Sequence, residues 1–194
     1  MSVLIPSLDK IKKLVIEEPV LESATVYLEG LSFKHVSQSY VSWLNDKEVC
    51  RENRHGRGNN TIELTRKYVE SVDNLDNIAA FAILAKDTGK HIGNTSLGNI
   101  SWENNSGEIS ILIGEKSYWG KGVAKETYRL LIEYGFNQLF LHRLYSGMTV
   151  RNKAMIKVAE SSGMSKEGIF KEAFYKDGIY VDIVMYGIIN PAHK

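Results

Sequence analysis

Hydrophobic residues along this chain follow two spacings, which together predict a mixture of helices and strands. The clearest helix spans 121–139, where apolar or small side chains recur on one face: Ala124, Tyr128, Leu131, Ile132, Gly135 and Phe136. Shorter patterns of the same kind predict three further helices, at 35–44, 61–72 and 152–162. In the two earlier ones we expect these side chains to face the core: Val36, Tyr40, Leu64, Tyr68, Val69 and Val72.

Short apolar or alternating runs predict seven strands, at 25–29, 79–86, 92–100, 108–114, 144–150, 170–175 and 180–188. Turn residues join two pairs of them, because 87–90 reads Asp-Thr-Gly-Lys and 176–179 reads Lys-Asp-Gly-Ile. An Asp-Gly pair between two strands is a strong hairpin signal. The order of elements predicts a mixed α/β (α+β) fold, whose sheet is antiparallel early and crosses over through helices later.

The composition is that of an ordinary globular protein. The chain has 194 residues, of which 43% are hydrophobic and 24% charged, so one domain can bury a core of its own. A net charge of +1 gives no overall field that favours nucleic acid or a membrane surface. Cys50 is the only cysteine, which excludes an internal disulfide and suits a reducing compartment, so we expect a cytoplasmic protein.

The chain divides into a short extension and one domain. Residues 1–20 carry charges of both signs, which is unlike a signal peptide or a membrane span. Ser7 can cap a short helix there, before Pro19 interrupts it. We therefore expect an N-terminal extension over 1–20 and a single domain over 21–190, with no repeat and no Gly/Ser-rich linker inside it.

The segment with the most chemical content runs from the predicted strand at 108–114 into the long helix. Gly120 and Gly122 stand just before the helix, where they let the backbone pass close to a ligand. Free amides of the first helical turn favour an anion such as a diphosphate, and Lys121 and Lys125 add positive charge. The spacing fits neither the Walker A loop nor the G-x-G-x-x-G loop. The glycines alone are equally consistent with a tight turn.

In context, this segment resembles the acetyl-CoA motif of the GNAT acetyltransferases, [QR]-x-x-G-x-[GA]. Gly122 and Ala124 match the motif, whereas Trp119 stands at the Gln/Arg position. That departure is common in the branch of ribosomal-protein N-terminal, antibiotic and aminosugar acetyltransferases. The resemblance covers roughly 21–189, because other segments match this branch in the right order: 22–28, 40–46, 141–144, 152–164 and 177–182.

The resemblance implies a GNAT fold, with a mixed central sheet of about seven strands, splayed in the middle and flanked by about four helices. Coenzyme A would lie between the strands at 108–114 and 144–150, with acetyl-CoA as the acetyl donor. The implied cofactor-binding residues are Ile111, Leu112, Ile113, Trp119, Gly120, Lys121, Gly122, Val123, Ala124, Asn152 and Lys157. Asn152 would cap its helix as well, and capping alone is the plainer interpretation.

Acyl transfer to an amine needs a neutral amine and a protonated leaving thiolate. The resemblance implies Glu108 as the general base, although an edge carboxylate in a salt bridge is equally consistent with its position. Many relatives have a Ser or a Tyr as proton donor where this chain has Met155 and Ala159. We therefore expect Tyr175 as the acid, with Tyr180, a water or no group at all as alternatives. Cys50 lacks the partners of a nucleophile.

The acceptor site is expected at the loop after the first helix and at the last hairpin. Its implied residues are Trp43, Glu52, Arg54 and His55. The loop also carries Arg51 and Arg57, so it could bind phosphate or carboxylate, or be only a solvated charged face. We slightly favour a nucleotide-linked aminosugar or a similar anionic small molecule.

The alternatives to this acceptor are a protein N-terminus and a non-catalytic acyl-CoA-binding role. A small-molecule amine is the expected partner rather than a protein. We expect no nucleic acid, membrane or metal to be bound, and the chain to be a monomer or homodimer.

Overall fold

A computed structural model of the chain describes residues 21–56, 58–73 and 75–193. The predicted extension at 1–20, with its short helix, lies outside these ranges. None of the helices within them is long and apolar enough to cross a membrane.

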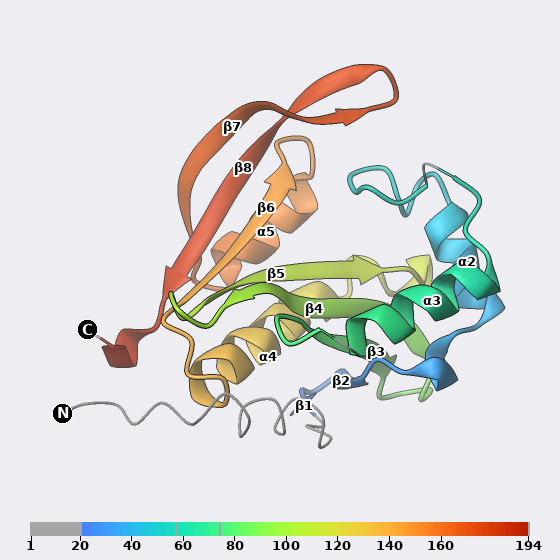
Figure 1. The fold of residues 1–194 in the computed structure, drawn as a ribbon, viewed down its shortest axis with the longest axis horizontal. Coiled ribbons are helices and arrows are strands. Elements are labelled where there is room, and N and C mark those ends of the chain that lie inside the picture. The colour runs from blue at the N-terminus through green and yellow to red at the C-terminus, as the bar shows by residue number, and fades with distance from the viewer. Residues whose placement is uncertain (1–20, 57, 74, 194) are drawn as a thin grey trace.

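The described residues form one mixed sheet of eight strands with helices on both faces, which confirms the predicted fold class (Figure 1). In chain order the strands are β1 Leu21–Glu22, β2 Val26–Gly30, β3 Ala79–Ala85, β4 His91–Ser101, β5 Ser106–Ile113, β6 Arg143–Thr149, β7 Ser165–Lys176 and β8 Ile179–Ile189. Their spatial order is β1-β2-β3-β4-β5-β6-β8-β7. The two-residue strand β1 makes eight strands instead of the predicted seven.

Four α-helices lie in the described ranges: α2 Gln38–Asn45, α3 Ile62–Asp73, α4 Val123–Asn137 and α5 Lys153–Ser161. Three short 3-10 helices accompany them: η1 Phe33–His35, η2 Lys116–Tyr118 and η3 Pro191–His193. The side chains of β3 alternate between two cores. Phe81 and Ile83 join the larger core under α4, whereas Ala82 and Leu84 join a smaller core with residues of α2 and α3. The sheet is therefore covered on both faces.

Two helices differ from the prediction. The chain over 35–44 is interrupted, because α2 begins only after Ser37, whose hydroxyl accepts a hydrogen bond from the Tyr40 amide. In α3 the apolar stripe is narrower than expected, since Leu64 and Tyr68 are exposed while Val69 is buried. Both outer hairpin strands, β7 and β8, extend beyond their predicted bounds, and Asp177 and Gly178 form the expected turn with positive φ.

The sheet splits between β5 and β6. These strands are parallel, as the crossover through α4 requires, and they pair over only three positions, the last of which joins Glu108 to Tyr145. Beyond it β6, β8 and β7 rise away from β5, so the backbones of the two arms diverge in a V, and the space between these strands is called the gap below (Figure 1). The predicted splay in the middle of the sheet is therefore present.

A buried chain of hydroxyl groups fixes the apex of this gap. The Ser146 hydroxyl, on β6, donates a 2.9 Å hydrogen bond to the Ile109 carbonyl of β5. The Tyr128 hydroxyl, on α4, lies 2.9 Å from the same Ser146 oxygen. Burial raises the pKa of Tyr128 to about 12, so the phenol stays neutral and keeps its proton. Helix α4 thereby fixes the place where the strands part.

Candidate functional site

The turn before α4 exposes a run of backbone amides. Gly120 and Gly122 have φ of +73° and +82°, a left-handed conformation that only glycine adopts readily. The first helical bond runs from the Glu126 amide to the Gly122 carbonyl. Within the described residues, the amides of 120–125 therefore donate to no backbone carbonyl. They lie at the positive end of a 15-residue helix, which is a suitable site for a phosphate or diphosphate group.

One edge of β5 also faces the open gap. Because the Ile109 carbonyl points toward Ser146 of β6, strand alternation points the backbone groups of Ile111 and Ile113 to the same side. The Ile113 carbonyl already accepts a 2.9 Å hydrogen bond from the indole of Trp119. The backbone of Ile111 is thus the part of this edge that can pair with an extended amide-containing ligand.

Leu112 does not belong to this edge. The backbone groups of the neighbouring even-numbered residues are directed toward β4. The Ser110 carbonyl accepts a hydrogen bond from the Thr95 hydroxyl, and the Gly114 amide donates one to the Ile92 carbonyl. By the same alternation the backbone of Leu112 is directed to β4, where Leu112 is paired with Asn94. The backbone of Leu112 is thus directed away from the gap, and its place among the cofactor-binding residues stays a prediction.

Helix α5 starts on the opposite arm of the gap. Asn152 caps it, accepting a 3.3 Å hydrogen bond from the Met155 amide, as expected. The NH₂ group of Asn152 makes no hydrogen bond with the described residues, so a ligand can use it. Ala159 is completely buried and Met155 packs against the core, and neither side chain has a proton to donate. Lys157 is exposed on this helix.

Glu108 lies at the apex, on the face of the sheet away from α4. Its carboxylate accepts a 2.7 Å hydrogen bond from the side chain of Asn99. Asn99 sits at an irregularity of β4 with φ of +48°, and such bulges commonly re-aim a side chain. Burial raises the pKa of the neighbouring Tyr145, and the Glu108 charge raises it further. Glu108 makes no ion pair among the described residues.

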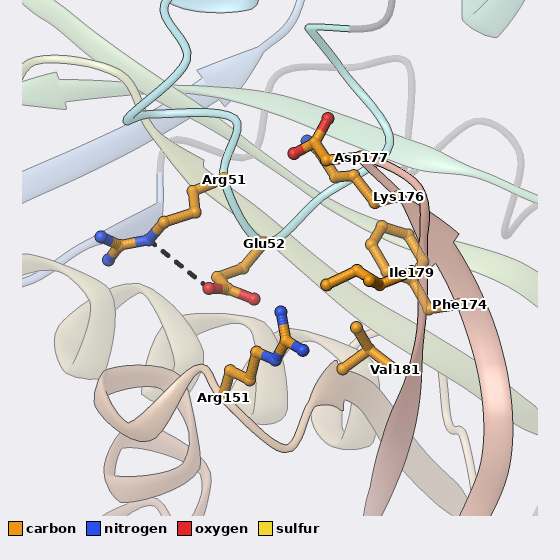
Figure 2. Close-up of a pocket in the computed structure, with 8 residues that line it drawn as sticks. All are labelled: Arg51, Glu52, Arg151, Phe174, Lys176, Asp177, Ile179 and Val181. Atoms are coloured by element: carbon orange, nitrogen blue, oxygen red, sulfur yellow. Dashed lines mark ion pairs between the residues drawn. The ribbon is translucent and has the colours of Figure 1, made fainter.

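A pocket of about 360 Å³ opens at the other end of β6 (Figure 2). Its lining comes from the loop after α2, from the turn between β6 and α5 and from the β7–β8 hairpin, and consists of Arg51, Glu52, Arg151, Phe174, Lys176, Asp177, Ile179 and Val181. Three cationic and two anionic side chains thus share the pocket with an apolar wall. The volume falls within the usual range of small-molecule sites.

Glu52 occupies the centre of the polar side of this pocket. One carboxylate oxygen accepts a 2.6 Å hydrogen bond from the buried Thr149 hydroxyl at the end of β6. The other lies 3.4 Å from the Arg51 guanidinium, and the Arg151 side chain points toward the same carboxylate (Figure 2). Glu52 thus lies in the pocket between Arg51 and Arg151 and is held by Thr149, whereas its role in binding the acceptor stays a prediction.

Four other predicted residues lie elsewhere. Trp43 is only 5% exposed, and its ring packs so closely on Gly114 that an added Cβ would lie 2.0 Å from it, so Trp43 is a core residue. Arg54 and His55 do not line the pocket. Tyr175 lies between Phe174 and Lys176, which face the pocket, so strand alternation directs it to the outer face beside Tyr180. Tyr175 therefore does not line this pocket, and its role as proton donor stays a prediction.

Sequence reasoning missed Arg151 and Lys176 and gave Arg51 no individual role. The sequence did hold a weak signal for Arg151, because it directly precedes the predicted cap Asn152. Cys50, by contrast, behaves as expected of a residue without catalytic partners: its thiol is buried and donates to the carbonyls of Trp43 and Leu44. Burial also raises the pKa of this thiol, which disfavours the reactive thiolate.

Comparison with known proteins places the chain in a family. The acetyltransferase (GNAT) domain matches residues 26–165. The chain belongs to the GNAT acetyltransferases. Members of this family use acetyl-CoA as the donor. The match includes β5, β6 and the glycine turn before α4, whereas the residues of the β7–β8 hairpin that form one wall of the pocket lie beyond its last residue.

Individual relatives agree with this assignment at lower coverage. An uncharacterized N-acetyltransferase, p20, from Bacillus licheniformis is 38% identical over 88 residues, which are 45% of this chain and 49% of that protein. The match thus spans about half the length of that relative.

Two solved structures share the fold. The ribosomal L7/L12 α-N-protein acetyltransferase in complex with coenzyme A has a TM-score of 0.81 and 21% identity, covering 90% of this chain and 99% of that one. The spermidine N-acetyltransferase from Vibrio cholerae, in complex with CoA and spermine, has a TM-score of 0.78 and 20% identity, covering 87% and 97%. At these identities the likeness concerns the fold alone.

The glycine turn yields a direct test of the phosphate site. Gly122→Val adds a branched side chain beside the free amides and strains a residue with positive φ, so acetyl-CoA affinity should fall more than about tenfold. Isothermal titration calorimetry measures the acetyl-CoA affinity of the variant. Gly178→Val is the matched control, because Gly178 has φ of +83° and equally open surroundings but lies in the distant β7–β8 turn. If the two variants bound acetyl-CoA with equal affinity, the phosphates of acetyl-CoA would have to bind at another site.

Proposed function

We propose that this protein is an acetyltransferase that moves the acetyl group of acetyl-CoA to a primary amine carrying an anionic group. The observation that carries the proposal is the pair of sites along one gap. Backbone amides at 120–125 suit the diphosphate of the donor, and a pocket rich in arginine at the end of β6 suits the acceptor. The apex between the arms holds Glu108.

In this proposal the donor follows β5. Its diphosphate is bound by the amides of 120–124, with Lys121 nearby, and Val123 contributes only its amide because its side chain is buried. The pantetheine arm pairs with the backbone of Ile111, whose amide can also stabilise the negative charge that develops on the acetyl oxygen. The NH₂ group of Asn152 is available from the opposite arm, and the exposed Lys157 adds positive charge on α5.

The reaction needs two proton transfers, one from the acceptor amine and one to the leaving thiolate. The amine nitrogen forms a bond to the acetyl carbon, and the carbon–sulfur bond breaks to give the thiolate. Glu108 accepts a proton from the ammonium, directly or through a water, so that the amine attacks in its neutral form. No side-chain donor stands at Met155 or Ala159, and the proton lost by the amine nitrogen on bond formation can neutralise the thiolate.

The acceptor pocket favours an extended, anionic amine. Arg51 and Arg151 can hold a phosphate or carboxylate, whereas a polyamine would add positive charge to a pocket whose three cations already outnumber its two carboxylates. Thr149, which holds Glu52, lies four residues beyond Tyr145, the partner of Glu108, so the pocket and the apex are roughly 13 Å apart along β6. A nucleotide-linked aminosugar is the acceptor that we favour, because it carries both an amine and phosphates.

The role of the base predicts a specific defect. Glu108→Gln keeps the size of the side chain but cannot accept the proton, so turnover at neutral pH should fall by about 10²–10⁴ while acetyl-CoA affinity stays nearly unchanged. Steady-state and single-turnover kinetics measure the two effects. Glu103→Gln, an exposed carboxylate in the β4–β5 turn, is the control. Wild-type turnover of Glu108→Gln, with chemistry rate-limiting, would make Glu108 a structural residue.

A panel of amines tests the function and the acceptor together. Free-thiol release from acetyl-CoA should be faster with phosphate- or carboxylate-bearing amines, including nucleotide-linked aminosugars, than with spermidine or peptide N-termini. With the preferred amine, Arg151→Ala should raise KM about tenfold or more, since a hydrogen bond to a charged group contributes roughly 1.5–3 kcal/mol. Arg54→Ala is the matched control, because Arg54 is exposed outside the pocket, and its KM should not change.

The outcomes of this panel separate the parts of the proposal. If none of the amines raised thiol release above the rate of acetyl-CoA hydrolysis, this result would contradict the enzymatic function and favour a binding protein. A preference for spermidine or peptides would retain the acetyltransferase and remove the anionic acceptor. An equal effect of Arg54→Ala and Arg151→Ala would show that the pocket does not select the acceptor.

A further inference from the structure

Lys176 joins two parts of the chain that are far apart in sequence. It lies at the end of β7, and its ammonium donates hydrogen bonds to three backbone carbonyls of the loop after α2: those of Cys50, Asn53 and His55. The distances to the Asn53 and His55 oxygens are 2.8 and 3.2 Å. The bonds to these residues span 121 to 126 positions of the sequence.

The arrangement matches the bonding capacity of the side chain. An ammonium group has three N–H donors and no acceptor, and here each donor has a carbonyl partner. Charge-assisted hydrogen bonds of this kind are the stronger ones in proteins. The three carbonyls converge on one point only while the loop keeps its present course, so the lysine stabilises that conformation of the loop.

This loop carries the charged side of the pocket. Arg51 and Glu52 lie between the first and second of the three carbonyls, and both line the pocket. The loop has other attachments: Lys116 pairs with Asp46 and Glu48 at its start, and Thr149 donates to Glu52 itself. Beyond Glu52, Lys176 is the connection that the described residues show between the segment 53–55 and the hairpin.

We propose that Lys176 is a positioning residue, whose ammonium holds the loop at 50–55 against the β7–β8 hairpin, so that Glu52 and Arg51 are positioned for the acceptor. The part concerning the acceptor rests on the function proposed above, whereas the part concerning the loop does not.

Proteolysis tests the loop without any substrate. An arginine-specific protease is used, and mass spectrometry follows cleavage after Arg51 and Arg54 only, so that changes of lysines elsewhere do not alter the sites counted. Lys176→Met should raise the cleavage rate about tenfold or more, because the loop loses its three charge-assisted bonds. Lys176→Gln, which keeps two donors without charge, should be intermediate, and Lys176→Arg should be nearest to the wild type. Lys166→Met, an exposed lysine on the same strand, should have no effect.

Kinetics then test the consequence for the acceptor. In Lys176→Met, KM for the amine identified by the panel should rise about tenfold or more and recover in Lys176→Arg, while acetyl-CoA affinity is unchanged. Equal cleavage of Lys176→Met and the wild type would overturn the proposal whatever the substrate. If Lys176→Met does not fold, equal cleavage of the Gln and Arg variants would overturn it. Faster cleavage with an unaltered acceptor KM would overturn the role in positioning. Absence of activity in the wild type would count against the proposed function and leave the proteolysis result valid.

Discussion

The parting of β5 from β6 depends on a hydrogen bond between a serine hydroxyl and a backbone carbonyl. Pairing of the two strands ends at Glu108, and the next carbonyl, that of Ile109, accepts from Ser146 instead of from a strand amide. Buried backbone groups need such partners, because leaving one unpaired costs free energy. Tyr128 supports the same oxygen from α4, so the apex is fixed from the core. Beyond this point both arms have backbone groups directed into the gap, where a ligand can pair with them.

The two ends of the gap obtain positive potential in different ways. At the start of α4 it comes from backbone amides and the helix dipole, which side-chain motion cannot rearrange, and the left-handed glycines hold them in place. At the end of β6 it comes from arginine side chains around Glu52, which adapt to the shape of a ligand. A fixed site suits a donor common to a whole family, and an adjustable one suits an acceptor that differs between its members.

The pocket at the end of β6 is assembled by elements that do not belong to a continuous sheet. The loop after α2 is attached at its start to Lys116, in its middle to Thr149 and at its end to Lys176, three residues from three different elements. Each attachment is polar and most are partly exposed, so their contribution to global stability is modest. Their effect is on geometry, since together they leave the loop little freedom to move away from the hairpin.

The sequence by itself determined the elements formed by near neighbours. The helix at 121–139, the glycine turn before it, the Asn152 cap and the Asp177–Gly178 turn all follow from local periodicity and backbone chemistry, and each is present. The order of the motifs then indicated the family.

Only the tertiary structure decided which side chains meet. Lys176 lies in the pocket, whereas Tyr175, its neighbour on the same strand, lies outside it. Glu52 is hydrogen-bonded to Thr149, which is 97 residues away in the sequence. Such contacts depend on how distant strands pair and diverge, which local spacing does not encode.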